Sequence, residues 1–168
     1  VAGFDVAQSP GEVRRRVGVL TETPGLYLRM WAMEYLDFYG QLYGLGKALR
    51  QARAAALLSR FGMAEAAHKR LSEYSKGMRQ KLALIRSMLH DPSVLLLDEP
   101  TSAMDPHSAR LVRNSIADLR GEKRAIILCT HNLAEAEELA DSIAIIRRGR
   151  IIEQGTTAER KSRLLGPP

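Results

Sequence analysis

The sequence is poor in the features that define several protein classes. One cysteine among 168 residues excludes a disulfide framework within the chain. No run of 18 or more apolar residues occurs, so a membrane-spanning helix is not expected, and no charged-then-apolar leader opens the chain. We therefore expect a cytoplasmic protein. The single cysteine, Cys129, ends the apolar run Ala125–Cys129 and is expected to be a small buried core residue rather than a reactive thiol.

What the chain does contain is an ordinary globular composition with an excess of positive charge. Its 45% hydrophobic residues are enough to bury a core in one domain of this size. The formal charge of +6 would suit an anionic partner such as a nucleotide, a nucleic acid or a lipid surface. For most individual basic residues, including the adjacent Arg14, Arg15 and Arg16, a solvated surface position is the simpler explanation.

Four apolar segments predict strands. Val1–Val6 has the pattern of an edge strand, and Val17–Leu20 is a short run with β-branched residues. Val94–Leu97 is bounded by prolines, as is typical of a parallel strand buried on both faces, and Ala125–Thr130 predicts a further buried strand.

Between the second and third of these strands, residues 29–90 have a helical pattern throughout. Helices are expected over about Met30–Tyr43 and Lys47–Arg60, with a shorter one over about Ala64–Arg70. One apolar and largely aromatic stripe marks the first of them, formed by Trp31, Tyr35, Phe38 and Leu42. After residue 90, strands and helices alternate, which predicts an α/β core with an inserted helical subdomain.

The end of the chain predicts an antiparallel hairpin and a helix. Ser142–Ile146 and Arg150–Glu153 are short apolar segments that flank a turn with a glycine. Gly155–Thr157 leads into an expected final basic helix.

The segment Ser75–Gln80 opens a helix in a way that suits an anion. Ser75 is a good N-cap, and apolar residues recur on one face after it, so a helix is expected from Lys76 to about His90. A helix N-terminus exposes unpaired N–H groups and a partial positive charge, and Gly77 allows a ligand to approach the backbone. From the physics alone, an ordinary capped amphipathic helix is the simpler explanation.

Two adjacent carboxylates, Asp98 and Glu99, follow the strand Val94–Leu97. Ligands of open α/β sheets bind outside the carboxyl ends of the strands, which makes this pair a candidate site. Adjacent strand residues point to opposite faces, so both acids can serve one ligand only if the strand ends between them, and Pro100 favours that ending. The alternative is that they cap the next helix or lie in solvent.

Asp105 and His131 have structural explanations of their own. Asp105 precedes a proline and is a good N-cap for a helix expected to run to about Arg120. His131 follows the last parallel strand and precedes a capping-box pattern at Asn132–Glu135. A lone histidine in such a place is more often structural than catalytic.

These motifs, in this order and within so short a span, resemble an ATP-binding-cassette (ABC) transporter ATPase domain. Leu71–Gln80 is similar to the family's signature motif, and Val94–Glu99 to its Walker B strand followed by the catalytic glutamate. Ser102–Asp105 resembles the D-loop, and Thr130-His131 resembles the switch region.

The resemblance implies ATP and Mg²⁺ as ligands and gives each motif a role. Asp98 would hold Mg²⁺, Glu99 would polarise the water that attacks the γ-phosphorus, and His131 would contact the γ-phosphate. The signature motif would grip ATP bound to a second ATP-binding subunit in a head-to-tail dimer, and the D-loop would link the two sites. The residues expected to contact nucleotide are Ser75, Lys76, Gly77, Met78, Arg79, Gln80 and Asp105.

Two departures from the family pattern stand out. No Gly-x-x-x-x-Gly-Lys-Ser/Thr phosphate loop (Walker A) occurs, and that loop supplies most of the phosphate contacts, so we expect an N-terminally truncated domain that is inactive alone. Glu22 stands where the family usually has a glutamine that senses Mg²⁺. A carboxylate can still meet the metal but cannot donate a hydrogen bond, and variants of this kind point to an exporter.

The resemblance also implies a domain layout and a partner. The fold would be a partial P-loop NTPase core of the α/β class, with a mostly parallel sheet, an inserted helical subdomain and a C-terminal β-hairpin. Residues 1–28 would supply core strands and the Glu22 loop, residues 29–90 the helical subdomain, and residues 91–168 the remaining motifs, the hairpin and the final helix.

ATP hydrolysis would power a separate transmembrane permease from the inner face of the membrane. The aromatic stripe lies where the family docks that permease, although packing within the helical subdomain explains it equally well.

Two other functions stay open. A soluble ABC-type ATPase acting on nucleic acid or the ribosome would suit the positive charge, but the separation of Glu22 from Ser75 is too short for the long coiled coils of chromosome-maintenance relatives. A non-catalytic interaction fragment would have lost the phosphate loop, and the presence of both Glu99 and His131 argues against it. No nucleic-acid partner is expected.

Overall fold

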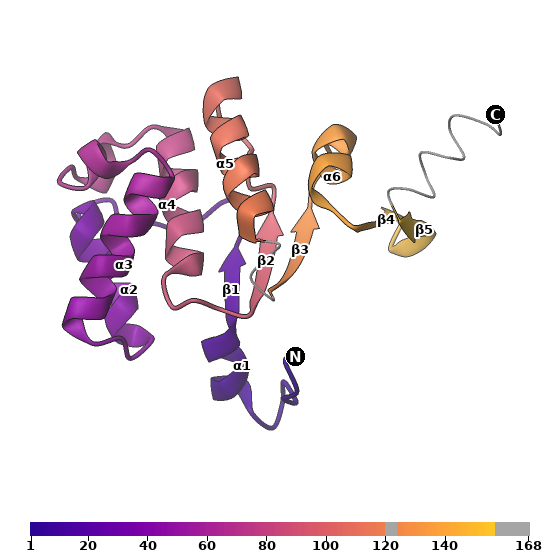
Figure 1. Cartoon of the computed structure of the whole chain (residues 1–168), viewed down its shortest axis with the longest axis horizontal. Helices are drawn as coiled ribbons and strands as arrows, with labels where there is room; N and C mark the ends of the chain where they lie inside the picture. The colour runs from indigo at the N-terminus through magenta and orange to yellow at the C-terminus, as the bar shows by residue number, and fades with distance from the viewer. Residues whose placement is uncertain (120–123, 157–168) are drawn as a thin grey trace. The chain divides into compact units, whose positions relative to one another are not determined.

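The computed structural model describes residues 1–119 and 124–156, and Figure 1 shows the elements along the chain. The chain falls into two compact units, Val1–Cys129 and a second that begins at Thr130. The basic helix expected after Gly155 lies outside the described residues. Within the described part of the chain, no helix has the length and apolar composition needed to cross a bilayer.

The first unit is built on a parallel sheet with the strand order β1-β2-β3 (Figure 1). The strands are Val17–Leu20 (β1), Val94–Asp98 (β2) and Ala125–Cys129 (β3). Val19 is paired with Leu96, and Leu96 with Ile127, so these three side chains share one face of the sheet. Because the strands are parallel, their carboxyl ends meet at one edge of the sheet.

Three helices lie between β1 and β2 in the sequence. They are α2 (Ala32–Leu42), α3 (Lys47–Arg60) and α4 (Lys76–Met88). The shorter helix expected over Ala64–Arg70 is wrong, since only Ala64–Ala66 forms a single 3₁₀ turn. The carbonyls of Ala67 and Lys69 instead accept hydrogen bonds from the first N–H groups of α2, which have no partners within that helix.

The sheet face that packs on α4 carries the core. Gly18 and Leu20 of β1 and Leu95 and Leu97 of β2 are buried on it. Gly18 has no side chain, which allows the backbones of β1 and α4 to approach closely. The start of α4 and the carboxyl end of β2 both belong to this first compact unit.

The opposite face of the sheet is open in the described part of the chain. Val19 is 44% exposed and Ile127 is 59% exposed, and Leu96 between them is only partly buried. Cys129, two residues after Ile127 on the same face, is exposed. The predictions that β2 is buried on both faces, that β3 is buried and that Cys129 is a core residue are therefore wrong. An apolar pattern shows which residues favour burial, but it does not show whether another element covers them.

The first residues form turns, so the expected edge strand at Val1–Val6 is also wrong. The Asp5 carboxylate accepts hydrogen bonds of 2.8 Å from the backbone N–H groups of Ala7 and Gln8. This turn competes with an extended conformation and leads into the helix α1, Pro10–Arg16.

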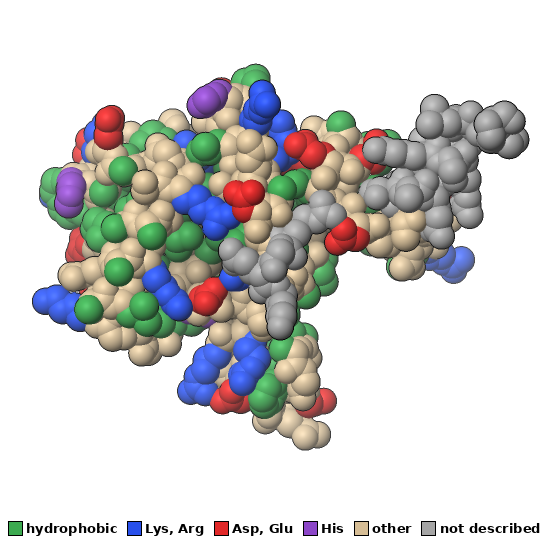
Figure 2. All heavy atoms as spheres, viewed as in Figure 1, with side chains coloured by type: hydrophobic (Ala, Val, Ile, Leu, Met, Phe, Trp, Pro, Cys, Tyr) green, Lys and Arg blue, Asp and Glu red, His purple; other side chains and the backbone are tan. Residues whose placement is uncertain are grey.

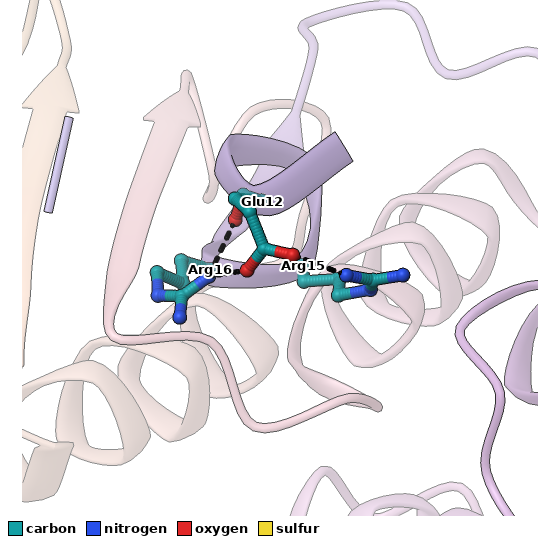
Figure 3. A network of polar contacts seen from close by, with 3 residues as sticks. All are labelled: Glu12, Arg15 and Arg16. Carbon is teal, nitrogen blue, oxygen red and sulfur yellow. Dashed lines mark hydrogen bonds and ion pairs between the residues drawn. The ribbon is translucent and has the colours of Figure 1, made fainter. Parts of the chain in front are cut away.

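Helix α1 carries basic side chains, which Figure 2 shows as a blue group at the surface, and Figure 3 shows Glu12 between Arg15 and Arg16. Glu12 accepts hydrogen bonds from the guanidinium groups of both Arg15 and Arg16, the latter at 2.6 Å. The hydrogen bond from Arg16 is the main reason why the pKa of Glu12 lies below its ordinary value. Arg16 also lies over the Phe4 ring, 4.2 Å from its centroid. These contacts explain the positions of Arg15 and Arg16 without any ligand.

Helix α5, Pro106–Asp118, completes the first unit and is joined to α3 by a side chain. The Arg60 guanidinium donates a 2.9 Å hydrogen bond to the backbone carbonyl of Ser115 and lies 3.6 Å from the carboxylate of Asp118. This contact links the helical subdomain to the helix that follows Asp105.

The second unit contains α6 and the hairpin that the sequence predicts. Its elements are α6 (Leu133–Leu139), β4 (Ser142–Arg147) and β5 (Arg150–Thr156), with β4 and β5 antiparallel. Arg148 and Gly149 at the turn both have positive φ, as in the two-residue turns that match the twist of a hairpin.

His90 joins three elements of the first unit. Its ring stacks on Tyr43 after α2, with centroids 3.7 Å apart, and its Nε2 lies 3.2 Å from the backbone carbonyl oxygen of Val17 in β1. Within the described residues its Nδ1 is buried without a hydrogen-bond partner. Burial lowers the pKa of His90 below its ordinary value.

A pKa that is lower in the folded protein means that protonation of His90 favours unfolding. We expect the melting temperature to fall as the pH is lowered from about 7.5 to about 5.5, across the ordinary pKa of histidine. His90→Phe keeps a ring but cannot titrate, so its melting temperature should change less over the same range. Exposed His68→Phe is the control and should keep the wild-type pH dependence. Equal pH dependence in His90→Phe and the wild type would contradict the prediction.

Candidate active site

The start of α4 has the N-cap that the sequence predicts. The Ser75 hydroxyl accepts a 3.2 Å hydrogen bond from the backbone N–H of Met78, and the helix begins at Lys76. Ser75 and Lys76 are both exposed. The first turn of α4 therefore presents its N–H groups and one cationic side chain at the surface.

A hollow of about 380 Å³ opens between this turn and the segment that leads into α5. It is lined by Ser75, Lys76, Gly77, Met78, Lys81, Ala103, Met104, Asp105 and Ser108. The two segments approach each other closely at Gly77, since a Cβ on it would lie 3.2 Å from the carbonyl oxygen of Ala103. Any side chain at this position would push against the backbone of the facing loop.

The two sides of the hollow carry opposite charges. Lys76 and Lys81 come from α4, and Lys81 is only 9% exposed. Across from them, Asp105 accepts a 3.0 Å hydrogen bond from the Ser108 N–H as the N-cap of α5. That bond is the main reason why the pKa of Asp105 is lowered, so its carboxylate stays ionised at neutral pH. An anionic group is favoured on the α4 side and disfavoured next to Asp105.

Lys81 and Ser108 also line the hollow, although neither was predicted as a site residue from the sequence. Lys81 is four residues after Gly77, and Ser108 is three after Asp105. Residues at these spacings are neighbours on a helix, so the two positions follow from helical periodicity once Gly77 and Asp105 are chosen.

Two of the predicted signature residues do not line the hollow. Arg79 donates a 3.2 Å hydrogen bond to the Ser72 carbonyl, and its Nε is buried. Gln80 is 4% exposed, and its side-chain amide donates a 3.2 Å hydrogen bond to the backbone carbonyl of Glu99. Both residues support the start of α4 from within the unit.

The carboxylate pair lies at the end of β2. The strand ends at Asp98, and Glu99 leaves the strand conformation with φ at +48°. The Glu99 N–H donates a 2.9 Å hydrogen bond to the carbonyl of Cys129 at the end of β3. Glu99 thus does not follow the alternation of the strand, which allows two adjacent acids to serve one site.

Asp98, the last residue of β2, and Glu22, two residues after the end of β1, are exposed side chains at the carboxyl ends of neighbouring parallel strands. In residues 1–119 and 124–156, no group of three or more histidine, cysteine or acidic side chains forms a metal cage. Mg²⁺ bound with a nucleotide does not require one, because it takes one or two carboxylates and completes its shell with phosphate and water. The donors at this edge of the sheet fit such an ion.

The switch region belongs to the second unit. Thr130 donates a 2.8 Å hydrogen bond from its hydroxyl to Glu135 and accepts one of 3.1 Å from the N–H of Asn132. Asn132 in turn accepts a 3.3 Å hydrogen bond from the N–H of Glu135 as the N-cap of α6. His131 therefore lies between two residues that are both anchored to the first turn of α6.

Comparison with known protein families matches residues 3–102, more than half of the chain, to the ABC transporter family. The chain belongs to the ABC transporter family. The matched range of this ABC transporter chain contains the start of α4 and the carboxylate pair, and it ends just before Ala103, where the other side of the hollow begins.

Individual relatives and a solved structure agree with this. The ABC transporter ATP-binding protein NatA of Bacillus subtilis is 43% identical over 157 residues, which are 92% of this chain and 63% of that protein. The fluoroquinolones export ATP-binding protein MT2762 of Mycobacterium tuberculosis is 40% identical over 146 residues, 87% of this chain and 47% of that protein. The chain therefore spans less than two thirds of the length of these relatives.

A solved structure of the ATP-binding subunit of an ABC transporter matches with a TM-score of 0.87 and 29% identity, covering 98% of this chain and 68% of that one. The family resemblance and the α/β fold with a parallel sheet and a hairpin, both predicted from the sequence, are confirmed.

Proposed function

We propose that this ABC transporter chain acts in an ATP-binding subunit that hydrolyses ATP to power transport, with Glu99 as the catalytic base. The observation that carries the proposal is the backbone of Glu99. It is held out of the strand at the carboxyl end of β2, next to Asp98 and in the same unit as the hollow at α4. Strained conformations of this kind cluster at functional sites, and this edge of a parallel sheet is where ligands bind.

One set of residues serves the subunit's own ATP. Asp98 and Glu22 would hold Mg²⁺, which would supply positive charge next to the phosphates. Glu99 orients the attacking water and accepts its proton. For His131, in the second unit, the family resemblance implies a hydrogen bond to the γ-phosphate, and that role stays a prediction. The exposure of Asp98 at the strand end supports this assignment, because the ion needs room for phosphate and water.

A second set serves ATP bound to another ATP-binding subunit in a head-to-tail dimer. Ser75, Lys76, Gly77 and Met78 offer the exposed first turn of α4 to the γ-phosphate of that nucleotide. Asp105, on the other side of the hollow, links the two sites across the dimer. Arg79 and Gln80 act from behind this surface rather than on the phosphate, which refines the expectation that all of these residues contact nucleotide.

The partner that receives the energy is a transmembrane permease. Of the aromatic stripe on α2, Tyr35 is buried, whereas Trp31 is 45%, Phe38 is 39% and Leu42 is 65% exposed. Tyr27, which is also exposed, meets Phe38 edge-on with ring centroids 6.2 Å apart. This surface suits an apolar segment of the permease on the inner face of the membrane, with no role for nucleic acid. The relative named for fluoroquinolone export supports an exporter.

The sequence contains no Gly-x-x-x-x-Gly-Lys-Ser/Thr loop, the segment whose backbone N–H groups cradle the phosphates of a nucleotide. We propose that these 168 residues do not turn over ATP by themselves. Activity assays therefore use the full gene product that carries them.

Gly77→Asp tests the proposed function. The new carboxylate lies near the N-terminus of α4, where it favours the helix but repels a phosphate. We expect ATP hydrolysis to fall by about 100-fold, the effect of losing one electrostatic contact to the transition state, while ATP binding to the subunit's own site is retained.

Gly77→Asn is the matched control for this substitution. Asparagine has nearly the shape of aspartate and meets the Ala103 carbonyl in the same way, but it carries no charge. Hydrolysis by Gly77→Asn should therefore fall much less than that of Gly77→Asp. Full hydrolysis by Gly77→Asp, or an equal loss in Gly77→Asn, would refute the role given to α4.

A further inference from the structure

Gln80 is a buried polar side chain that makes a specific contact away from the hollow. It lies in the second turn of α4 and is 4% exposed. Its Nε2 donates a 3.2 Å hydrogen bond to the backbone carbonyl oxygen of Glu99, 19 positions further along the chain. The residue that follows it, Lys81, lines the hollow, but Gln80 does not. Its amide is therefore directed at Glu99 and not at the ligand site on α4.

The backbone of Glu99, which Gln80 contacts, has a conformation that other segments must stabilise. With φ at +48°, Glu99 occupies the left-handed region, which non-glycine residues adopt only when the surrounding structure imposes it. The peptide groups of Glu99 are held from several elements. Its N–H donates to the carbonyl of Cys129 in β3 at 2.9 Å, and its carbonyl accepts from the N–H of Ser102 at 3.1 Å and from Gln80.

These hydrogen bonds differ in what they connect. The bonds to Cys129 and Ser102 join backbone groups at the sheet edge and within the following turn. The bond from Gln80 comes from a side chain on α4, whose first turn faces the hollow. Through it, the position of α4 acts directly on the backbone that aims the Glu99 carboxylate.

We propose that Gln80 is a positioning residue that couples the signature turn of α4 to the catalytic carboxylate of Glu99. The inference rests on the proposed role of Glu99 as the base. When the start of α4 engages nucleotide on a partner subunit, the Gln80 hydrogen bond sets the geometry of Glu99 toward the ATP of its own subunit. One side chain thus connects two nucleotide sites that belong to different subunits.

Gln80→Met in the full gene product removes the donor and keeps the length of the side chain. We expect kcat for ATP hydrolysis to fall by about 10- to 100-fold, as small displacements of a catalytic group do, with the KM for ATP unchanged. A residue that only stabilised the fold would not change kcat selectively.

Ser87→Ala is the control for general damage to α4. Ser87 is 2% exposed in the same helix, and its hydroxyl donates a 2.7 Å hydrogen bond to the Leu84 carbonyl without contacting Glu99. It should lose thermal stability to a similar extent as Gln80→Met and keep the wild-type kcat.

Gln80→Glu tests whether hydrogen-bond donation is the property that matters. An ionised glutamate cannot donate to the carbonyl of Glu99, but the protonated acid can, and burial favours the protonated form by raising its pKa. The ratio of its kcat to that of the wild type should therefore rise as the pH is lowered, whereas the ratio for Gln80→Met should stay constant.

The outcomes separate this inference from the proposed function. A wild-type gene product without ATPase activity overturns both. An active wild type with an unchanged kcat in Gln80→Met, or with a changed KM and an unchanged kcat, overturns the role of Gln80 alone.

Discussion

Glu99→Gln is expected to lower the rate of ATP hydrolysis by about 10²- to 10⁴-fold, the usual contribution of a general base, while ATP binding is retained. Glutamine has nearly the same shape as glutamate and can occupy the same backbone conformation, but its amide cannot accept a proton from the attacking water. The measurement is phosphate release by the full gene product, together with nucleotide binding under the same conditions.

The control for this change is Glu65→Gln. Glu65 is an exposed carboxylate in the 3₁₀ turn after α3, in the same unit as Glu99 but apart from the sheet edge. It should hydrolyse ATP at the wild-type rate. An unchanged turnover rate in Glu99→Gln would remove Glu99 from the mechanism, and the inference about Gln80 would fall with it.

Gly18→Ala is expected to destabilise the first unit by about 3 kcal/mol or more, at the upper end of what overpacking costs. A Cβ on Gly18 would lie 2.0 Å from the backbone carbonyl oxygen of Ser87, 2.8 Å from Leu95 and 2.9 Å from Pro92. The nearest of these atoms belongs to the backbone of α4 and cannot move without displacing the helix from β1. For a chain of this length, the loss corresponds to a fall of roughly 10 °C in melting temperature.

Thermal or urea unfolding followed by circular dichroism measures this effect. Gly11→Ala is the matched control, since Gly11 lies in α1 and a Cβ there meets no atom within 4 Å. Alanine is also the better helix former, so Gly11→Ala should melt at or slightly above the wild-type temperature. A wild-type melting temperature in Gly18→Ala would show that β1 and α4 do not pack as closely as described.

Much of the secondary structure follows from local signals. Helix α3 has the predicted bounds Lys47–Arg60, and α4 and α5 begin after the predicted N-caps Ser75 and Asp105. An N-cap is a contact between residues three apart, and amphipathic periodicity is visible within one helix. Signals of this range can be read from the sequence, and so can the order of the motifs that carry the family resemblance.

The failed predictions concern residues whose partners lie elsewhere. Ala64–Arg70 has helical residues, but the carbonyls of Ala67 and Lys69 cap α2, which precedes them in the chain. Cys129 stands in an apolar run typical of a buried strand, yet the face it shares with Ile127 is open in the described residues. In the first case a distant segment determined the conformation, and in the second no described element covers the face that the apolar pattern led us to expect in the core.

By itself, the sequence determined which residue types are available for a site: the carboxylates Asp98 and Glu99 after a strand, the capped turn at Ser75, and the family to which they point. Only the tertiary structure decided how these residues are held. It turned Glu99 out of the strand, placed Gly77 against Ala103, and directed Gln80 inward onto the backbone of Glu99. The physical reason is that the backbone geometry of a catalytic residue depends on hydrogen bonds from segments distant in sequence, and local patterns carry no information about them.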